Sequence, residues 1–171
     1  MRRLLLNFAH PAYERSRMNR ALLEALEGLP SVTVNDLYAS YPDFMIDVAR
    51  EQELLTDHDI IVFQHPLYWY SSPSILKEWQ DLVLTHRWAY GSEGNALAGK
   101  HWIQAVTTGG PEEVYCCEGQ NRFTIAEFLR PFEATAQLCN MVWQEPYVIY
   151  GTHELPAEAM APTAQAYREF I

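Results

Sequence analysis

The sequence lacks the motifs of several common classes of protein. Only three of its 171 residues are cysteines, and they form no C-x-x-C pair, so we expect neither a disulfide framework nor a zinc site. Cys116 and Cys117 are adjacent; a redox pair is one interpretation, but neighbouring cysteines rarely close a relaxed disulfide, and we interpret them as loop residues. The six histidines show no H-E-x-x-H motif, and no metal site is predicted. A G-x-G-x-x-G fingerprint is also missing, which disfavours a Rossmann dinucleotide fold.

Basic residues are scarce as well. The chain has 12 Lys and Arg residues against 22 Asp and Glu residues, a formal net charge of -10. Phosphate backbones and anionic lipids repel such a protein, so we expect no nucleic-acid partner and membrane association only through another protein. No apolar run approaches the ~20 residues of a membrane span. The first run stops at Asn7, too short for a signal peptide, and the few cysteines favour the reducing cytosol.

Short apolar runs alternate with longer segments of helical periodicity. Hydrophobic residues make up 49% of the chain, which suits a single α/β domain over residues 1–171. The pattern predicts strands at 4–9, 32–36, 59–64, 101–108 and 141–150, and helices at 16–28, 48–58, 74–86, 122–139 and 155–171. Pro131 predicts that a second helix opens inside the fourth helical segment. Such alternation predicts a parallel sheet with helices on both faces and ligands at the carboxyl ends of its strands.

The polar segment AHPAYERSRMN follows the first predicted strand. Ser16 is placed to cap the next helix, and the N–H groups there, with the Ser16 and Asn19 side chains, suit an anion such as a phosphate. His10 and Arg17 add positive charge. The alternative is a plain helix cap flanked by surface arginines.

The segment HPLYWYSSP follows the third predicted strand. Pro66 and Pro73 keep it out of regular structure. Tyr68, Trp69 and Tyr70 suit a flat aromatic wall for a planar ring ligand. Alternatively, these rings pack beneath the loop as a satellite core, or they are buried in a contact between two copies of the chain.

The segment TTGGPEEVYCCEGQN follows the fourth predicted strand. Thr107 and Thr108 offer hydroxyls, and Gly109 and Gly110 let the backbone approach a ligand, so that its amides can bond the polar edge of a heterocycle. An ordinary glycine-rich turn is the alternative. Together the three segments provide a phosphate site, an aromatic wall and an amide edge, which are the parts that flavin mononucleotide (FMN) needs.

Longer motifs connect these segments with a known family. AHP…S-x-x-N, HPLYWYSSPSILKEWQD and TTGG, in this order and on these elements, resemble the loops of flavodoxin-like NAD(P)H:quinone oxidoreductases. DLYASYPDFMIDVAREQELL, FQHPLYWYSSPSILKEW and LAGKHW are most similar to the small ancillary subunits of glutathione-gated potassium efflux systems. The resemblance covers nearly the whole chain. It implies a three-layer flavodoxin-like α/β fold with a five-stranded parallel sheet in the order 2-1-3-4-5.

The resemblance also implies a cofactor and an assembly. It implies tightly bound FMN, NAD(P)H as co-substrate, and a homodimer with each flavin near the subunit boundary. The FMN-binding residues that it implies are His10, Ser16, Arg17, Met18, Asn19, Leu67, Tyr68, Trp69, Tyr70, Thr107, Thr108, Gly109 and Gly110.

The implied chemistry is a two-step hydride transfer. NAD(P)H gives a hydride to flavin N5, and a quinone or other electrophile then takes it. The amides of Gly109 and Gly110 would favour the anionic reduced flavin. In this family a tyrosine and a histidine after TTGG handle the proton; Tyr115 occupies the tyrosine position, but Asn121 occupies the histidine position. Because Asn cannot donate a proton at neutral pH, Tyr115 or water has to serve.

Two functions follow from the resemblance. One is a soluble FMN-dependent quinone reductase, and the other is a subunit that binds the cytoplasmic part of a potassium efflux (K+/H+ antiport) transporter and activates it. We favour the combination, in a cytoplasmic protein held at the inner face of the cell membrane by its transporter. The alternative is a stand-alone reductase without a transporter. A fold that has lost its flavin is disfavoured by Ser16, Asn19 and the TTGG segment.

Overall fold

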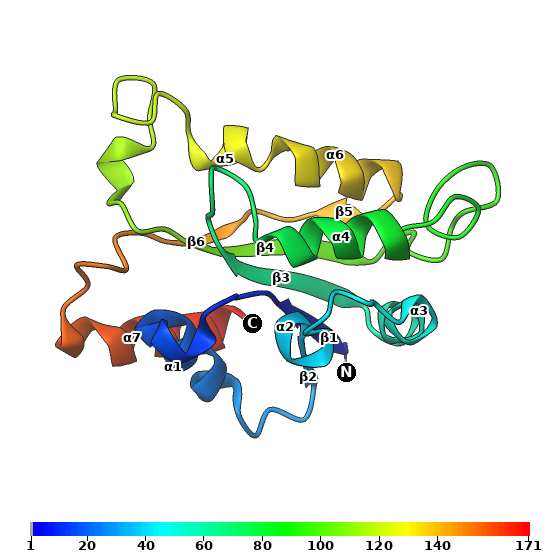
Figure 1. Ribbon diagram of the computed structural model, residues 1–171, viewed down its shortest axis with the longest axis horizontal. Coiled ribbons are helices and arrows are strands. Elements are labelled where there is room, and N and C mark those ends of the chain that lie inside the picture. The colour runs from blue at the N-terminus through cyan, green and yellow to red at the C-terminus, as the bar shows by residue number, and fades with distance from the viewer. Residues whose placement is uncertain (1) are drawn as a thin grey trace.

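A parallel β-sheet forms the centre of the molecule (Figure 1). The computed structural model describes residues 2–171, so residue 1 of the expected domain lies outside the described residues. The strands are β1 (Leu4–Phe8), β2 (Val32–Asp36), β3 (Ile60–Pro66), β4 (His101–Thr107), β5 (Val142–Trp143) and β6 (Tyr147–Ile149). Their order, β2-β1-β3-β4-β5 with β6 also beside β4, is the flavodoxin-like order that the resemblance implies.

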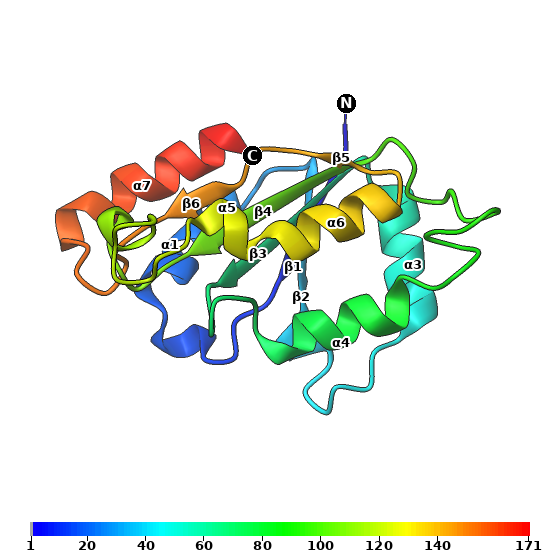
Figure 2. The ribbon, with the colours of Figure 1, turned by 90° about the horizontal axis from the view of Figure 1, so that it is seen from above.

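Helices cover both faces of the sheet. On one face α1 (Arg17–Leu26) lies beside α7 (Ala157–Phe170) (Figure 1). The other face carries α3 (Val48–Asp57), α4 (Ser74–Val83) and α6 (Arg130–Leu138), with the one-turn helices α2 (Leu37–Ser40) and α5 (Ile125–Phe128). Figure 2 shows α4 and α6 lying across the strands of that face. Short 3-10 turns lie at Tyr13–Arg15 and Glu112–Val114.

The core has two halves, one on each side of the sheet. Leu5 packs into the half beneath α4 and α6, whereas Leu4 and Leu6 pack into the half beneath α1 and α7, because successive side chains of a strand point to opposite faces. Trp79 and Tyr167 are fully buried in the two halves. This two-sided burial explains why the strands are continuous apolar runs in the sequence.

The fifth position of the sheet differs from the prediction. A single strand over 141–150 is wrong: β5 pairs with the beginning of β4 and β6 with its end, and residues 144–146 interrupt them. Pro146 has no N–H to donate to the ladder, which explains the interruption. β6 therefore reaches the same edge of the sheet as the end of β4.

Most helix predictions are confirmed, with shorter boundaries. α4 ends at Val83 rather than residue 86, and the chain then forms turns. The break in 122–139 is confirmed, because α5 ends at Phe128 and α6 carries Pro131 in its first turn, where a missing N–H costs nothing. The one-turn helix α2 was not expected. Asp36 caps it by accepting from the Ala39 N–H.

The parallel register brings the carboxyl ends of the strands together. Phe8 of β1 pairs with Gln64 of β3, and Pro66 of β3 pairs with Thr107 of β4. The segments that follow β1, β3, β4 and β6 therefore meet at one edge of the sheet.

Candidate functional site

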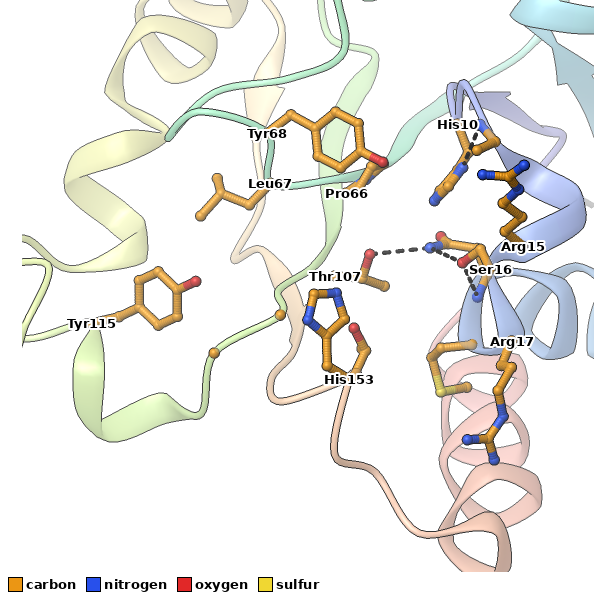
Figure 3. A pocket seen from close by; sticks show the side chains of 16 residues that line it. His10, Arg15, Ser16, Arg17, Pro66, Leu67, Tyr68, Thr107, Tyr115 and His153 are labelled. Carbon is orange, nitrogen blue, oxygen red and sulfur yellow. Dashed lines mark hydrogen bonds between the residues drawn. The ribbon is translucent and has the colours of Figure 1, made fainter.

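A cavity of about 720 Å³ opens at this edge of the sheet (Figure 3). Ligand pockets of small molecules and cofactors commonly have this size. It is lined by the segments after β1, β3, β4 and β6, through His10, Ala12, Arg15, Ser16, Arg17, Met18, Asn19, Pro66, Leu67, Tyr68, Thr107, Gly109, Gly110, Tyr115, Thr152 and His153.

The beginning of α1 forms the cationic end of the cavity. The Ser16 side chain caps the helix by accepting from the backbone N–H of Asn19 at 3.3 Å, as the sequence predicts. The N–H groups of Arg17 and Met18 open the helix and have no carbonyl four residues earlier to bond within it. The side chains of Arg15 and Arg17 line the same end, and the Arg17 guanidinium donates to Met160 Sδ of α7 at 3.1 Å. The amide donors of the helix N-terminus and the positive charge of these two side chains make this end complementary to a phosphate.

A chain of buried hydrogen bonds fixes this end of the cavity to the core. The Tyr167 hydroxyl of α7 donates to Gln64 Oε1 at 2.9 Å, and Gln64 Nε2 donates to Asn19 Oδ1 at 3.1 Å. Asn19 Nδ2 in turn lies 3.1 Å from both Ser16 Oγ and Thr107 Oγ1. Burial raises the pKa of Tyr167, which keeps its hydroxyl protonated and able to donate. These hydrogen bonds connect helix α1 to strand β4 beneath the cavity.

His10 presents an N–H donor at the rim. Its side chain is nearly buried, and Nδ1 accepts from the Ala12 N–H at 3.1 Å. Burial lowers the pKa of His10 more than Asp36 raises it, so the ring is neutral at neutral pH. The proton of the neutral ring is then on Nε2. The ring also meets Tyr68 edge-on, with the centroids 6.1 Å apart.

The aromatic segment after β3 is divided between the cavity and the surface. Leu67 and Tyr68 line the cavity (Figure 3), whereas Trp69 and Tyr70 do not, although the resemblance implied FMN contacts for all four. Both of these residues have left-handed backbone angles (φ 49° and 61°), which turn the chain outward. Trp69 is 93% exposed. Tyr70 packs on Phe128, with ring centroids 4.9 Å apart.

The TTGG segment forms the opposite wall of the cavity. Thr107, Gly109 and Gly110 line it, but Thr108 does not: it is buried, and its hydroxyl donates to the Gly110 carbonyl at 2.8 Å. A Cβ at Gly109 would lie 2.7 Å from the His153 ring, so this position needs glycine for a close approach. Thr108 therefore shapes the turn that exposes the glycine backbone.

The two candidate proton-handling residues are separated. Tyr115 lines the cavity, with its hydroxyl near Gly110. Asn121 lies outside the cavity lining, and its side-chain oxygen accepts from the Tyr70 hydroxyl at 3.3 Å.

Sequence reasoning missed the segment after β6 and also Arg15. Thr152 and His153 line the cavity, and Thr152 is fixed because its N–H and its hydroxyl both donate to the Thr108 carbonyl, each at 2.9 Å. The signal was the strand-end rule itself, which applies to the fifth strand position as well as to the other three. The residues in GTHELP carry no motif of their own.

The residues present fit FMN. The cationic end at α1 suits its phosphate, Leu67 and Tyr68 offer an apolar wall for a ring, and the Gly109–Gly110 backbone is bare where a polar ring edge needs amide donors. Across residues 2–171, three or more His, Cys, Asp or Glu side chains nowhere gather into a possible metal site. In the same part of the chain, no helix combines the length and apolarity needed to cross a membrane.

Comparison with known proteins gives this chain named relatives. The family description "Flavodoxin-like fold" matches residues 2–171. The glutathione-regulated potassium-efflux system ancillary protein KefG of Pectobacterium atrosepticum is 49% identical over 169 residues, which is 99% of this chain and 92% of the relative.

Three solved structures are similar over the full length. General stress protein 14 of Treponema denticola, solved in complex with FMN, is 38% identical with a TM-score of 0.89 over 98% of this chain and 94% of that one. An NADPH-quinone reductase from P. pentosaceus is 33% identical with a TM-score of 0.89 over 98% and 96%. A protein named as a thermophilic tryptophan halogenase from Streptomycin violaceusniger is 48% identical with a TM-score of 0.93 over 97% of this chain and 96% of that one.

The fold, the cavity at the strand ends and these full-length similarities agree. The chain belongs to the flavodoxin-like fold family, with KefG ancillary proteins among its relatives and an NADPH-quinone reductase among its structural neighbours.

Proposed function

We propose that this protein is an FMN-dependent NAD(P)H:quinone oxidoreductase that also serves as the ancillary subunit activating a glutathione-regulated potassium-efflux system. The observation that carries the enzymatic part is the cavity, which joins a phosphate-binding helix terminus, an apolar wall and bare glycine amides at one sheet edge. The regulatory part rests on full-length similarity to KefG.

In this proposal, different cavity residues bind the phosphate and the ring system of the cofactor. Ser16, with the first N–H groups of α1, binds the phosphate, and Arg15 and Arg17 neutralise its charge. Tyr68 and Leu67 exclude water from one side of the ring system. When bound, FMN accepts a hydride from NAD(P)H and passes it to a quinone or related electrophile.

The opposite wall stabilises charge and supplies a proton donor. The Gly109 and Gly110 amides, which line the cavity, would hold the polar edge of the ring system and stabilise negative charge there. The Tyr115 hydroxyl, near Gly110, is the protein's donor to a substrate oxygen. Asn121 takes no part in this, since it lies outside the cavity lining and bonds to Tyr70.

A homodimer accounts for the exposed aromatic residues beside the cavity. Trp69 is 93% exposed, Phe123 is 53% exposed, and Tyr70 packs with Phe128 next to them. A second copy of the chain covers these rings in the proposal and closes the mouth of each cavity. Apolar patches of this kind mark protein interfaces.

The transporter sets the location of the protein. The proposal places it in the cytoplasm, on the inner face of the cell membrane through contact with the transporter. The second candidate function, a reductase without a transporter, keeps the same cavity chemistry.

The enzymatic proposal is tested by loading the protein with FMN, desalting it and adding NADPH. We expect retained flavin absorbance that NADPH bleaches and a quinone restores. Ser16→Ala weakens FMN retention because it removes a cap and a phosphate donor, whereas Ser92→Ala, in an exposed loop, is the matched control. Loaded protein without NADPH-dependent turnover of any of several quinones contradicts the enzymatic proposal.

The regulatory proposal is tested in cells that carry the transporter. We expect the protein to co-purify with it, and deletion of the protein to slow potassium efflux after an electrophile is added. Unchanged efflux, with no co-purification, would leave the stand-alone reductase.

A further inference from the structure

His153 is a cavity residue to which the proposed function gives no role. It follows β6, and its ring lies across Gly109, where a Cβ would stand 2.7 Å from Cε1 and 3.0 Å from Nδ1. Figure 3 shows the ring pointing into the cavity toward Thr107. A glycine at 109 thus serves two purposes: it bares an amide, and it makes room for an imidazole beside that amide.

The backbone of His153 is fixed while its ring is free to bind. Thr152 is tied to the Thr108 carbonyl through both its N–H and its hydroxyl. Within residues 2–171, neither ring nitrogen of His153 has a hydrogen-bond partner. A ring held in this way, with both nitrogens available, suits contact with a ligand rather than support of the loop.

The other charged and titratable groups around the cavity do not duplicate this position. Arg15 and Arg17 belong to the phosphate end at α1, and His10 is a neutral donor beside Tyr68. Tyr115 offers an uncharged hydroxyl near Gly110. The nearest carboxylate along the chain is that of Glu154, which is exposed. His153 is therefore the cavity residue whose ring offers an N–H beside the Gly109 backbone.

We infer that the His153 ring stabilises the negative charge that FMN gains on reduction by donating a hydrogen bond from its N–H group. The inference rests on the proposed function. The hydride carries two electrons and one hydrogen from the nicotinamide to flavin N5, the nicotinamide becomes oxidised, and the flavin gains one negative charge, spread over N1 and the C2 carbonyl. When the hydride passes to a quinone, that charge moves to the quinone oxygen, which takes a proton from the Tyr115 hydroxyl to complete the hydroquinone, and solvent then returns a proton to Tyr115. His153 thus offers a ring N–H in the cavity lining, to which Asn121 does not belong.

The test measures how tightly each variant binds oxidised and reduced FMN. His153→Gln removes the imidazole ring but keeps a polar side chain, and we expect reduced FMN to bind about tenfold more weakly, because charge-assisted hydrogen bonds are worth this much. Oxidised FMN keeps its affinity within about twofold. A tenfold fall in the ratio of the affinity for reduced FMN to the affinity for oxidised FMN lowers the midpoint potential of the bound flavin by about 30 mV. A spectroscopic redox titration measures this potential.

Two further variants separate hydrogen bonding from shape. His153→Arg keeps N–H donors, and we expect it to hold the ratio of reduced to oxidised affinity within about threefold of the unchanged protein. His86→Gln, in an exposed loop after α4, changes neither affinity.

The outcomes distinguish this inference from the proposed function. Failure of the unchanged protein to bind FMN overturns both. FMN binding with the same affinity ratio in His153→Gln overturns the role of His153 alone. Tighter binding of both forms by His153→Gln also overturns it, because the ring would then be filling the space that the cofactor needs.

Discussion

Two polar clusters lie near the carboxyl ends of the strands, and they differ in whether their hydrogen bonds are complete. The first surrounds Glu51 of α3, which is fully buried. Its carboxylate accepts from Tyr41 at 2.6 Å, from Asn35 and Trp79 at 2.8 Å each, and from Arg50. The second lines the cavity, where the donors at the start of α1, at Gly109 and at His153 face open space. A closed polar cluster joins elements of the fold, whereas an open one is available to a ligand.

Removal of Glu51 tests the closed cluster and has the largest expected effect. Glu51→Ala leaves Tyr41, Asn35 and Trp79 without their shared acceptor, and we expect the free energy of unfolding to fall by about 3–5 kcal/mol. Urea denaturation measures this loss. The matched control is Glu53→Ala, an exposed carboxylate on the same helix, which should cost less than about 0.5 kcal/mol. A similar small loss for both variants would mean that the closed cluster contributes little.

Asn19 belongs to both kinds of cluster, since it is buried but lines the cavity. Asn19→Ala breaks contacts to Ser16, Thr107 and Gln64 at once. We expect a stability loss of about 1–3 kcal/mol, with FMN binding at least about tenfold weaker because the start of α1 is no longer fixed. Calorimetric titration with FMN and urea denaturation measure the two effects. Asn95→Ala, in an exposed loop, is the control, and a stability loss without an affinity loss would separate Asn19 from the site.

Trp69 tests the surface beside the open cluster. Asn tolerates the left-handed backbone at this position, so Trp69→Asn should change stability by less than about 0.5 kcal/mol. We expect the dimer to weaken, as sedimentation velocity at several concentrations would detect. Leu138→Ser, an exposed apolar side chain on α6, should leave the dimer intact. A dimer of unchanged strength in Trp69→Asn argues against the aromatic interface.

The pH dependence of stability has the smallest expected effect. Burial lowers the pKa of His65 and of His10 below the ordinary value of 6.5, so the unfolded chain binds protons that the folded chain rejects. The two histidines stabilise the fold fully at pH values above 6.5, the ordinary pKa that they have in the unfolded chain. This stabilisation declines as the pH falls from 6.5 toward the lower pKa that they have in the folded chain. Urea denaturation between about pH 7 and about pH 5 should show a falling free energy of unfolding.

A matched pair of variants measures how much of this pH dependence of the free energy of unfolding comes from His10. We expect His10→Gln to reduce the loss at acid pH and His86→Gln to retain it. An equal slope in both variants would remove His10 from the account.

The sequence contained most of the fold, because its elements have clear periodicity. The strand at 59–64 and the cap at Ser16 follow from local pattern alone. The interrupted strand at 141–150 did not, because Pro146 and two separate pairings with β4 are consequences of tertiary structure. The cavity was predicted in part for the same reason: Tyr68 and Trp69 are adjacent aromatic residues, and their local pattern does not indicate that Tyr68 lines the cavity while Trp69 is exposed. His153 was missed because a lone histidine in a turn has no pattern until the fold brings it against Gly109.

The central claim is that the open cluster at the strand ends binds FMN through its phosphate at the start of α1. The most direct measurement compares FMN with riboflavin, which has the same ring system without the phosphate, in a fluorescence titration of the flavin-free protein. We expect riboflavin to bind at least about 100-fold more weakly than FMN, since riboflavin has no phosphate to contact the start of α1 and the arginine side chains there. Equal affinity for the two flavins, or no binding of either, would contradict it.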